Sequence, residues 1–408
     1  MKISFLLKLA WRNNLRNKRR TFLVSLMVGL GLAALIFVDG MSIGMADNIV
    51  KSATGTFLGH AQIHREGFRN SNDIDLAINE SDRVLKELAQ DEKIESFAPR
   101  ALSFSMLASA SNSDSIMLYG IDAEKEKNIS RINDFINKGE FLKEDGQNEI
   151  VIGSELAESL EVGIDEHIIV TVAQYKTGEL SQGRFRITGI FHSNSKQMDK
   201  SLAFINLSEF HKLLAMNGEI HEIAVKFKDF KEAESDFFSI RYSKKSNEAL
   251  SWPALMPEVM AASKMSAIGI LITATILFMI VSLGIMNTLF MAIFERVFEF
   301  GILRSIGTRP FQLALMIVLE AVMIALTSIA LGSLIGFAAV HIVGINGLNY
   351  NGIEFAGATF LEPVIPVSRL FQYIVYPSVL MMFTVLISFY PAFYASKITP
   401  LKAMRKSL

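Results

Sequence analysis

The sequence predicts a membrane protein with four α-helical spans in a 1+3 arrangement and a large extracytoplasmic α/β domain inserted between spans one and two. Three observations predict this fold class: where the apolar segments fall, how charge differs between segments, and short β-branched runs in the long polar segment. Half of the 408 residues are hydrophobic and the mean hydropathy is +0.34, yet 20% are charged. This balance indicates membrane-spanning and water-exposed parts in one chain.

Four apolar segments approach or exceed the length of about 20 residues that a helix needs to cross the hydrocarbon core of a bilayer. They cover residues 22–44, 267–294, 311–341 and 373–394. Ser42-Ile43-Gly44 resembles a signal-peptide cleavage site. The first segment exceeds the roughly 7–15 residues of a signal-peptide core, so we expect it to be retained as a span.

The charge distribution predicts which segments lie in the cytoplasm. Residues 1–21 and 395–408 carry basic but no acidic side chains, whereas residues 45–266 carry 25 Lys/Arg against 35 Asp/Glu. Short Lys/Arg-rich flanks stay in the cytoplasm. We therefore expect both termini and residues 295–310 inside, and residues 45–266 and 342–372 outside. The chain has no cysteine, so the outer domain cannot use disulfides.

A basic amphipathic helix is predicted over residues 1–21. Lys8, Arg12, Arg16 and Arg19 recur at helical spacing. Anionic lipid head groups at the inner surface attract such side chains, so we predict a membrane-surface helix. A simpler reading, compatible with the first, is that these charges only fix the topology.

The segment 45–266 has the short elements of a mixed α/β domain. Runs rich in β-branched and aromatic residues predict strands at 150–152, 168–172, 185–190 and 223–227, and capped polar-apolar stretches predict helices at 81–90 and 154–160. Residues 176–179 have the composition of a hairpin connection. His60 and His64 lie in an extended stretch, where they would stand about 13 Å apart, too far to share one metal ion.

Motifs for catalysis are missing from the sequence. It contains no G-x-x-x-x-G-K-[ST] phosphate-binding loop, no H-E-x-x-H and no G-x-S-x-G. We therefore expect no enzymatic activity, no metal site and no bound cofactor in this chain.

The third span contains an acidic residue and a pair of glycines. Glu320 lies about ten residues into the span, and an acid at that depth indicates either a proton relay or a polar contact between helices. The span contains no further charged residue to continue a relay, so we favour the contact. Gly332 and Gly336 have the G-x-x-x-G spacing that permits close helix approach.

The connection between spans two and three, Glu295-Arg-Val-Phe-Glu-Phe-Gly-Ile-Leu-Arg-Ser-Ile-Gly-Thr-Arg-Pro310, carries the most specific pattern. Glu295 and Glu299 lie one turn apart, beside a set of apolar residues at helical spacing: Val297, Phe298, Ile302 and Ile306. Gly307 and Pro310 then end the helix. We expect a short helix along the membrane that contacts another protein.

This connection closely resembles the cytoplasmic coupling loop of ABC-transporter permeases of the MacB/LolC–LolE/FtsX superfamily. Further stretches resemble the family along the whole chain: residues 10–20 at the entry to the first span, the G-H-x-Q-I-H stretch 59–64 of LolE-like members, residues 120–163 of a MacB-type periplasmic domain, and the closing motif from Tyr390 to Pro400 with Ala403 and Arg405.

The resemblance implies a dimer of permeases, as a homodimer or with a paralogue, and two ABC ATPase subunits that bind ATP and Mg. MacB carries a fused ATPase domain and this chain has none, which implies a separate subunit. The hairpin Ala173–Gly183 lacks the long proline-bearing hook of LolC, so LolE-like is the closer label. Residues assigned to ATPase coupling are Glu295, Arg296, Glu299, Gly301, Leu303, Arg304 and Gly307.

Mechanotransmission is the implied activity: ATP-driven movement of the coupling loop is relayed to the outer domain, with the long third span as a stalk. The cargo is expected to be a lipoprotein or another amphipathic molecule, taken up with an extracytoplasmic carrier or adaptor. Alternatives are MacB-like efflux of a peptide or small molecule, FtsX-like activation of an outer partner and, more distantly, a ligand sensor. We expect a bacterial inner-membrane protein that contacts lipids and no nucleic acid.

Overall fold

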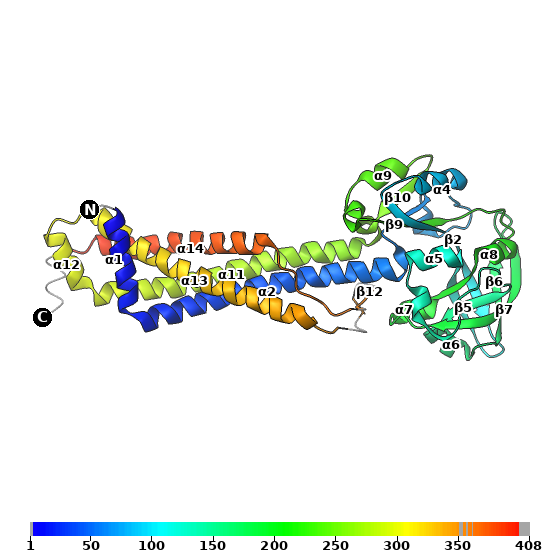
Figure 1. Ribbon diagram of the computed structural model, residues 1–408, viewed down its shortest axis with the longest axis horizontal. Coiled ribbons are helices and arrows are strands. Elements are labelled where there is room, and N and C mark those ends of the chain that lie inside the picture. The colour runs from blue at the N-terminus through cyan, green and yellow to red at the C-terminus, as the bar shows by residue number, and fades with distance from the viewer. Residues whose placement is uncertain (1–2, 351–353, 356–357, 361, 400–408) are drawn as a thin grey trace. The chain divides into compact units, whose positions relative to one another are not determined.

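The structure is a computed structural model that describes residues 3–350, 354–355, 358–360 and 362–399. The closing-motif residues Pro400, Ala403 and Arg405 lie outside this part of the chain. The chain folds into two compact units: a helical unit of residues 1–45, 263–348 and 364–408, and an α/β unit of residues 46–262 and 349–363. Figure 1 shows the elements of each unit.

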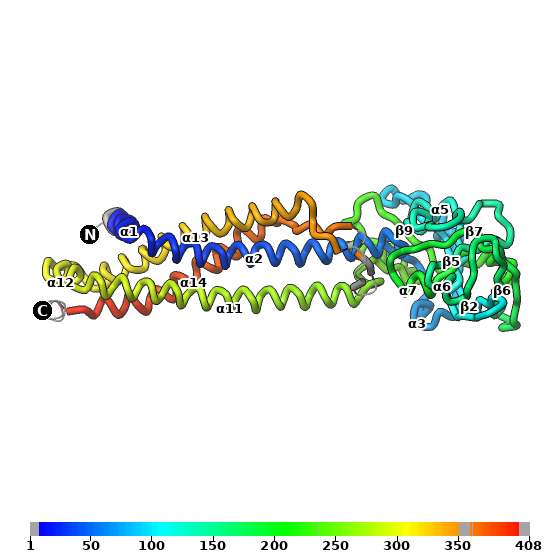
Figure 2. Tube along the Cα trace, turned by 90° about the horizontal axis from the view of Figure 1, so that it is seen from below, coloured from blue at the N-terminus to red at the C-terminus, as the bar shows by residue number. Residues whose placement is uncertain are grey.

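The helical unit contains the four long apolar helices that the sequence predicts. Its helices are α1 (Ile3–Arg16), α2 (Lys18–Ala53), α11 (Pro257–Glu295), α12 (Val297–Ser305), α13 (Pro310–Asn346) and α14 (Leu370–Ser396). Each long helix extends beyond the predicted apolar segment at both ends. Figures 1 and 2 show α1, α12 and the C-terminal end of α14 at the same end of this unit.

α13, the third span that is expected to act as a stalk, has 37 residues and is longer than the predicted segment 311–341. α11 has 39 residues. α2 and α11 both include residues of the α/β unit, whereas α13 lies wholly in the helical unit. The two spans on either side of the inserted domain therefore continue into it as helices.

Small residues let α2 and α13 approach closely, as the G-x-x-x-G spacing suggests. A Cβ on Gly332 would lie 2.6 Å from the carbonyl oxygen of Gly29, and one on Gly336 would lie 3.3 Å from Cα of Ala33. Ser25 and Thr327 share a hydrogen bond of 2.8 Å along the same contact. Close backbone packing and a polar pair replace the hydrophobic driving force that is absent between helices in lipid.

The α/β unit is built on a ten-stranded sheet with the order β10-β1-β9-β2-β3-β8-β5-β7-β4, in which β6 pairs with β2 and β7. The β3–β8 and β5–β7 pairs are parallel and the others are antiparallel. The strands are β1 (Ala61–Arg65), β2 (Ile94–Ala108), β3 (Ser113–Ile121), β4 (Ile136–Gly139), β5 (Glu149–Gly153), β6 (His167–Ala173), β7 (Leu180–Phe191), β8 (Leu202–Asn206), β9 (Glu222–Phe227) and β10 (Asn247–Ser251).

Short helices accompany this sheet. They are the π-helix Thr54–Leu58, α3 (Phe68–Ser71), α4 (Ser81–Ala89), α5 (Ala123–Ile129), the 3₁₀ helix Ile132–Phe135, α6 (Ser154–Leu160), α7 (Lys196–Ser201), α8 (Leu207–Leu214), the 3₁₀ helix Phe230–Glu234, α9 (Phe237–Tyr242) and α10 (Trp252–Leu255). A separate pair, β11 (Glu354–Phe355) and β12 (Ala358–Thr359), is antiparallel.

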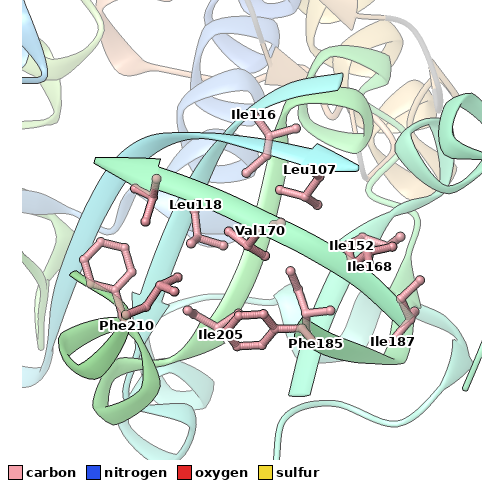
Figure 3. Close-up of a cluster of buried hydrophobic side chains, with 14 of the residues drawn as sticks. Leu107, Ile116, Leu118, Ile152, Ile168, Val170, Phe185, Ile187, Ile205 and Phe210 are labelled. Atoms are coloured by element: carbon pink, nitrogen blue, oxygen red, sulfur yellow. The ribbon is translucent and has the colours of Figure 1, made fainter. Parts of the chain in front are cut away.

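The predicted strands and helices of this unit are confirmed, and alternation along the strands explains its core. Ile168, Val170 and Val172 of β6 are buried, while the residues between them are more exposed. They pack with Phe185 and Ile187 of β7 in the cluster that Figure 3 shows. The β6–β7 pairing also confirms the predicted hairpin, whose turn places Lys176 and Gly178 at positive φ.

Candidate site around helix α12

Helix α12 is a separate nine-residue helix between two long apolar helices. Arg296, at φ −116° and ψ 14°, breaks the helical backbone after α11. Gly307, at φ 99°, turns the chain after α12, and Pro310 starts α13. Glu295 therefore belongs to the end of α11, which corrects its predicted place on the coupling helix.

The two faces of α12 differ in polarity and exposure. Phe300 and Gly301 are buried, and Leu303 packs partly buried against the helical core. The opposite face carries two large apolar side chains, Phe298 and Ile302, which are 49% and 43% exposed, and Ile306 follows directly after the helix with an exposed fraction of 78%. We call these three residues the apolar stripe. An exposed apolar patch of this kind marks a contact with protein or membrane.

The charged residues assigned to ATPase coupling bind groups of their own chain. Glu299 accepts from Arg16 of α1 at 2.7 Å and from Arg296 at 2.9 Å. Glu295 accepts from Arg20 of α2 at 2.9 Å. The sequence assigns these acids to a surface for the partner; in the structure they also pair with α1 and α2, and the Glu299 and Glu295 side chains remain 41% and 40% exposed.

Arg304 and Gly307 form the turn that follows α12. The Arg304 guanidinium donates to the carbonyl oxygen of Thr308 at 3.2 Å. The positive φ of Gly307 is a backbone conformation that residues with a Cβ rarely adopt. These two residues therefore set the path between α12 and α13.

Glu320 is buried in α13, where it joins three elements. Its carboxylate accepts from Asn13 of α1 at 2.6 Å and from Arg296 at 2.8 Å, and its main-chain carbonyl accepts from Asn14 at 3.1 Å. The Glu320 and Arg296 side chains are 5% and 10% exposed. The structure thus places the intramembrane acid in a polar contact between helices, and its partners compensate for the cost of burying a charge.

The ionisation of Glu299 keeps its ion pairs formed near neutral pH. Partial burial acts to raise the pKa of Glu299, but the hydrogen bonds from Arg16 and Arg296 outweigh burial and hold that pKa below its ordinary value. A carboxyl group whose pKa is lower in the folded state than in the unfolded state stabilises the folded protein at any pH above the unfolded-state pKa. This contribution is lost as the pH falls through the folded-state pKa.

The four basic side chains predicted to face the lipid lie on two helices. Lys8 and Arg12 of α1 are exposed, beside the exposed apolar side chains of Trp11 and Leu15, and Arg19 is exposed on α2. This combination suits a helix at a lipid surface. Arg16, the fourth of these cations, is 61% exposed and also pairs with Glu299 of α12.

A second buried acid of the helical unit was missed by sequence reasoning. Asp39 lies in the first span, and Gln372 of α14 donates to its carboxylate at 2.9 Å. The Gln372 amide also donates to the carbonyl of Val367 at 3.3 Å, and its oxygen accepts from the Arg369 main chain at 3.0 Å. An aspartate within an apolar run was the available signal.

The α/β unit contains a buried ion cluster, which is structural in character. The Arg100 guanidinium donates two hydrogen bonds to Glu126, at 2.9 and 2.6 Å, and one to Glu222 at 2.6 Å. It also donates to the carbonyl of Phe57 at 2.7 Å. Each nitrogen of this guanidinium donates to a protein acceptor, which is the arrangement of a structural ion cluster.

One Ser, His and Asp arrangement in this unit lacks the geometry of a hydrolase. Ser154 Oγ and Asp199 Oδ2 both lie 2.9 Å from the same nitrogen, Nδ1 of His192. A catalytic relay needs the serine and the carboxylate on opposite ring nitrogens. Among the described residues, no group of three or more His, Cys, Asp or Glu side chains could hold a metal ion.

The histidines of the G-H-x-Q-I-H stretch are part of the sheet, as their predicted extended conformation requires. His60 precedes β1 and accepts from the main-chain nitrogen of Phe227 at 3.1 Å, and His64 lies on β1. Burial is the main reason that the pKa of His60 falls to about 4 and that the pKa of His64 is lowered. Both imidazoles are neutral near pH 7.

Comparison with known proteins identifies the family of this chain. The description "MacB-like periplasmic core domain" matches residues 21–236, and "FtsX-like permease C-terminal" matches residues 271–400. The first match covers more than half of the chain. The chain therefore belongs to the MacB/LolC/LolE/FtsX family of ABC-transporter permeases. It is a permease subunit of the inner membrane, with a MacB-type α/β domain between its first and second spans.

Relatives of several names share this family. The lipoprotein-releasing system transmembrane protein LolC of Buchnera aphidicola subsp. Schizaphis graminum is 25% identical over 97% of this chain and 96% of its own length. LolE of Haemophilus influenzae is 20% identical over 73% of each chain, and the ABC transporter permease YtrF of Bacillus subtilis is 23% identical over 82% and 83%. Because both LolC and LolE proteins match, the preference for a LolE-like label stays a prediction.

Two solved extracytoplasmic domains are also similar. The periplasmic region of MacB from Actinobacillus actinomycetemcomitans is 15% identical, covers 50% of this chain and 94% of its own, and has a TM-score of 0.35. The extracellular domain of the noncanonic ABC-type transporter YknZ from Gram-positive bacteria is 9% identical, covers 47% and 98%, and has a TM-score of 0.33.

Proposed function

We propose that this chain transmits ATP-driven motion of a separate ATPase subunit to its extracytoplasmic domain, and that α12 is the element on which the ATPase docks. The observation that carries this proposal is the apolar stripe: three large apolar side chains exposed on a short helix between two spans and at the C-cap of that helix. The family is that of permease subunits, which implies an ABC ATPase partner and a second permease.

The stripe, rather than the charges, forms the docking surface in this proposal. Glu295 and Glu299 already accept hydrogen bonds from Arg20 and Arg16, so they have little to gain from a partner. Phe298, Ile302 and Ile306 have no comparable cover. Removing apolar side chains from water favours association by about 25 cal/mol per Å² buried.

For cargo, we propose a lipoprotein or another amphipathic molecule. The relatives named LolC and LolE are proteins of a lipoprotein-releasing system. A cavity of about 610 Å³ in the α/β unit, lined by apolar side chains such as Met198, Leu202 and Met256 and by polar ones such as Gln197 and Ser201, suits a molecule with both characters. The ATPase would bind ATP and Mg, and this chain would bind no cofactor.

The test of this function is co-purification. Expressed with its neighbouring genes, the chain should co-purify with an ATPase subunit, and the complex should hydrolyse ATP. The isolated chain, without a phosphate-binding loop, should hydrolyse none. Robust hydrolysis by the isolated chain, or a complex that lacks any ATPase, would refute the assignment.

The proposed orientation places both termini and α12 in the cytoplasm and the α/β unit outside. Because the chain has no cysteine, single cysteines report their side without background. Lys143→Cys in the α/β unit should react with a membrane-impermeant maleimide in intact cells, and Arg309→Cys should react only after permeabilisation. Labelling of Arg309→Cys in intact cells would contradict this topology.

A further inference from the structure

Five side chains form a chain of four hydrogen bonds that begins and ends on α1 and links this helix to α12 and α13. On α1, Asn13 donates to Glu320 of α13 at 2.6 Å. Glu320 also accepts from Arg296 at 2.8 Å, and Arg296 donates to Glu299 of α12 at 2.9 Å. Glu299 accepts from Arg16 of α1 at 2.7 Å, so the chain of hydrogen bonds ends on the helix where it began. We call these five residues the clamp.

The inner half of the clamp is the strong half. Arg16 and Glu299 are exposed to solvent, where an ion pair stabilises little. Arg296 and Glu320 are almost completely buried, so separating them would leave a charge without a partner in a medium of low polarity. Arg296 is also the residue at which α11 ends and α12 begins. The buried pair therefore fixes the root of α12 to α13.

This chain of hydrogen bonds restricts how α12 can move. A displacement of α12 relative to α13 separates Arg296 from Glu320, and a displacement relative to α1 separates Glu299 from Arg16. Asn14 adds a second attachment of α1 to α13 through the Glu320 carbonyl, at 3.1 Å. Energetic coupling between sites travels through such contiguous polar and packed contacts.

We propose that the clamp is a positioning device that makes α1, α12 and α13 move as one body, so that motion delivered to α12 is passed to the third span and to the surface helix together. This proposal rests on the proposed function, in which α12 receives that motion. Arg296 and Glu320 are its positioning residues, and they act on transmission without touching the ATPase.

The test replaces the clamp by a reversible covalent link. Arg16→Cys and Glu299→Cys are introduced together, and a short, reducible bis-methanethiosulfonate joins α1 to α12. The buried pair is removed in the same background by Arg296→Met with Glu320→Leu, since apolar replacement of a complete buried pair preserves folding far better than removal of one partner.

Two properties of the full permease–ATPase complex are measured. The first is association with the ATPase, and the second is the change in hydrogen–deuterium exchange of the α/β unit between the nucleotide-free and the vanadate-trapped state.

With the buried pair intact, we expect the cross-link to leave the nucleotide-dependent exchange unchanged. Without the buried pair, ATPase association should persist while the exchange response falls at least about fivefold, the lower range of allosteric coupling. Cross-linking should restore the response, and reduction should abolish it again. A purely structural role predicts lost association or no rescue.

Three results would overturn the clamp. They are a cross-link that blocks the response of the intact chain, a full response without Arg296 and Glu320, and a loss that the cross-link does not restore. An unmodified complex that shows no nucleotide-dependent exchange in its α/β unit would instead overturn the proposed function, and this proposal with it.

Discussion

Ile302→Asp is expected to prevent association with the ATPase subunit while leaving the permease folded. Ile302 is 43% exposed at the middle of the apolar stripe, so aspartate meets no steric conflict within the chain. At an interface, the change removes apolar contact and buries a carboxylate. A loss of about 3 kcal/mol lowers the affinity roughly 100-fold. Co-purification of the ATPase at matched permease levels measures this effect.

Ile240→Asp is the matched control. Ile240 is a 75% exposed isoleucine on α9 of the α/β unit, and the substitution is chemically identical. It should leave the amount of bound ATPase unchanged. Equal ATPase recovery with both variants would show that the apolar stripe is not the docking surface.

Arg100→Met is expected to destabilise the α/β unit by about 3–5 kcal/mol, the usual cost of removing one partner from a buried ion pair. The variant leaves Glu126 and Glu222 buried without their common cation. Methionine fills much of the volume of the arginine stem, so the loss is electrostatic rather than a cavity. Amide hydrogen exchange in β2 and β9, measured on the full chain, should accelerate accordingly.

An exposed arginine of the same unit provides the comparison. Arg83 of α4 is 56% exposed and pairs with Glu80 and Glu87, which are 46% and 36% exposed, so Arg83→Met should leave the free energy of unfolding nearly unchanged. Similar exchange rates in the two variants would mean that the Arg100 cluster contributes nothing beyond a surface ion pair.

The spans, the short strands and the existence of α12 could be predicted from the sequence because each depends on a local pattern. A span needs an uninterrupted apolar run, and β6 and β7 need alternation such as that of Phe185 and Ile187. The break at Gly307 and Pro310 is equally local. The family resemblance rested on the same stretches, and the family descriptions that match the chain confirm it.

The partners of the charged residues could not be predicted in this way. Asn13 and Glu320 are 307 positions apart, and Arg16 and Glu299 are 283 apart. Periodicity says which side of a helix a residue occupies but not which distant helix lies against it. The sequence therefore assigns the acids of the coupling segment to the ATPase but does not predict their contacts with α1 and α2.

This difference changes how charge reversal at Glu299 should be understood. Glu299→Lys would place a cation between Arg16 and Arg296, so its first effect is to break contacts within the chain. Loss of ATPase binding in that variant would not identify a docking surface. The apolar stripe gives a cleaner test because none of its side chains takes part in the clamp.

Site-specific photo-cross-linking from Phe298 tests the central claim most directly. With benzoylphenylalanine in place of Phe298, illumination of cells that also express the ATPase subunit should give a covalent permease–ATPase product. The same probe at Ile240 should give none. A Phe298 probe that reacts only with lipid or with the permease itself, while the ATPase is present and co-purifies, would contradict the assignment of α12 as the docking helix.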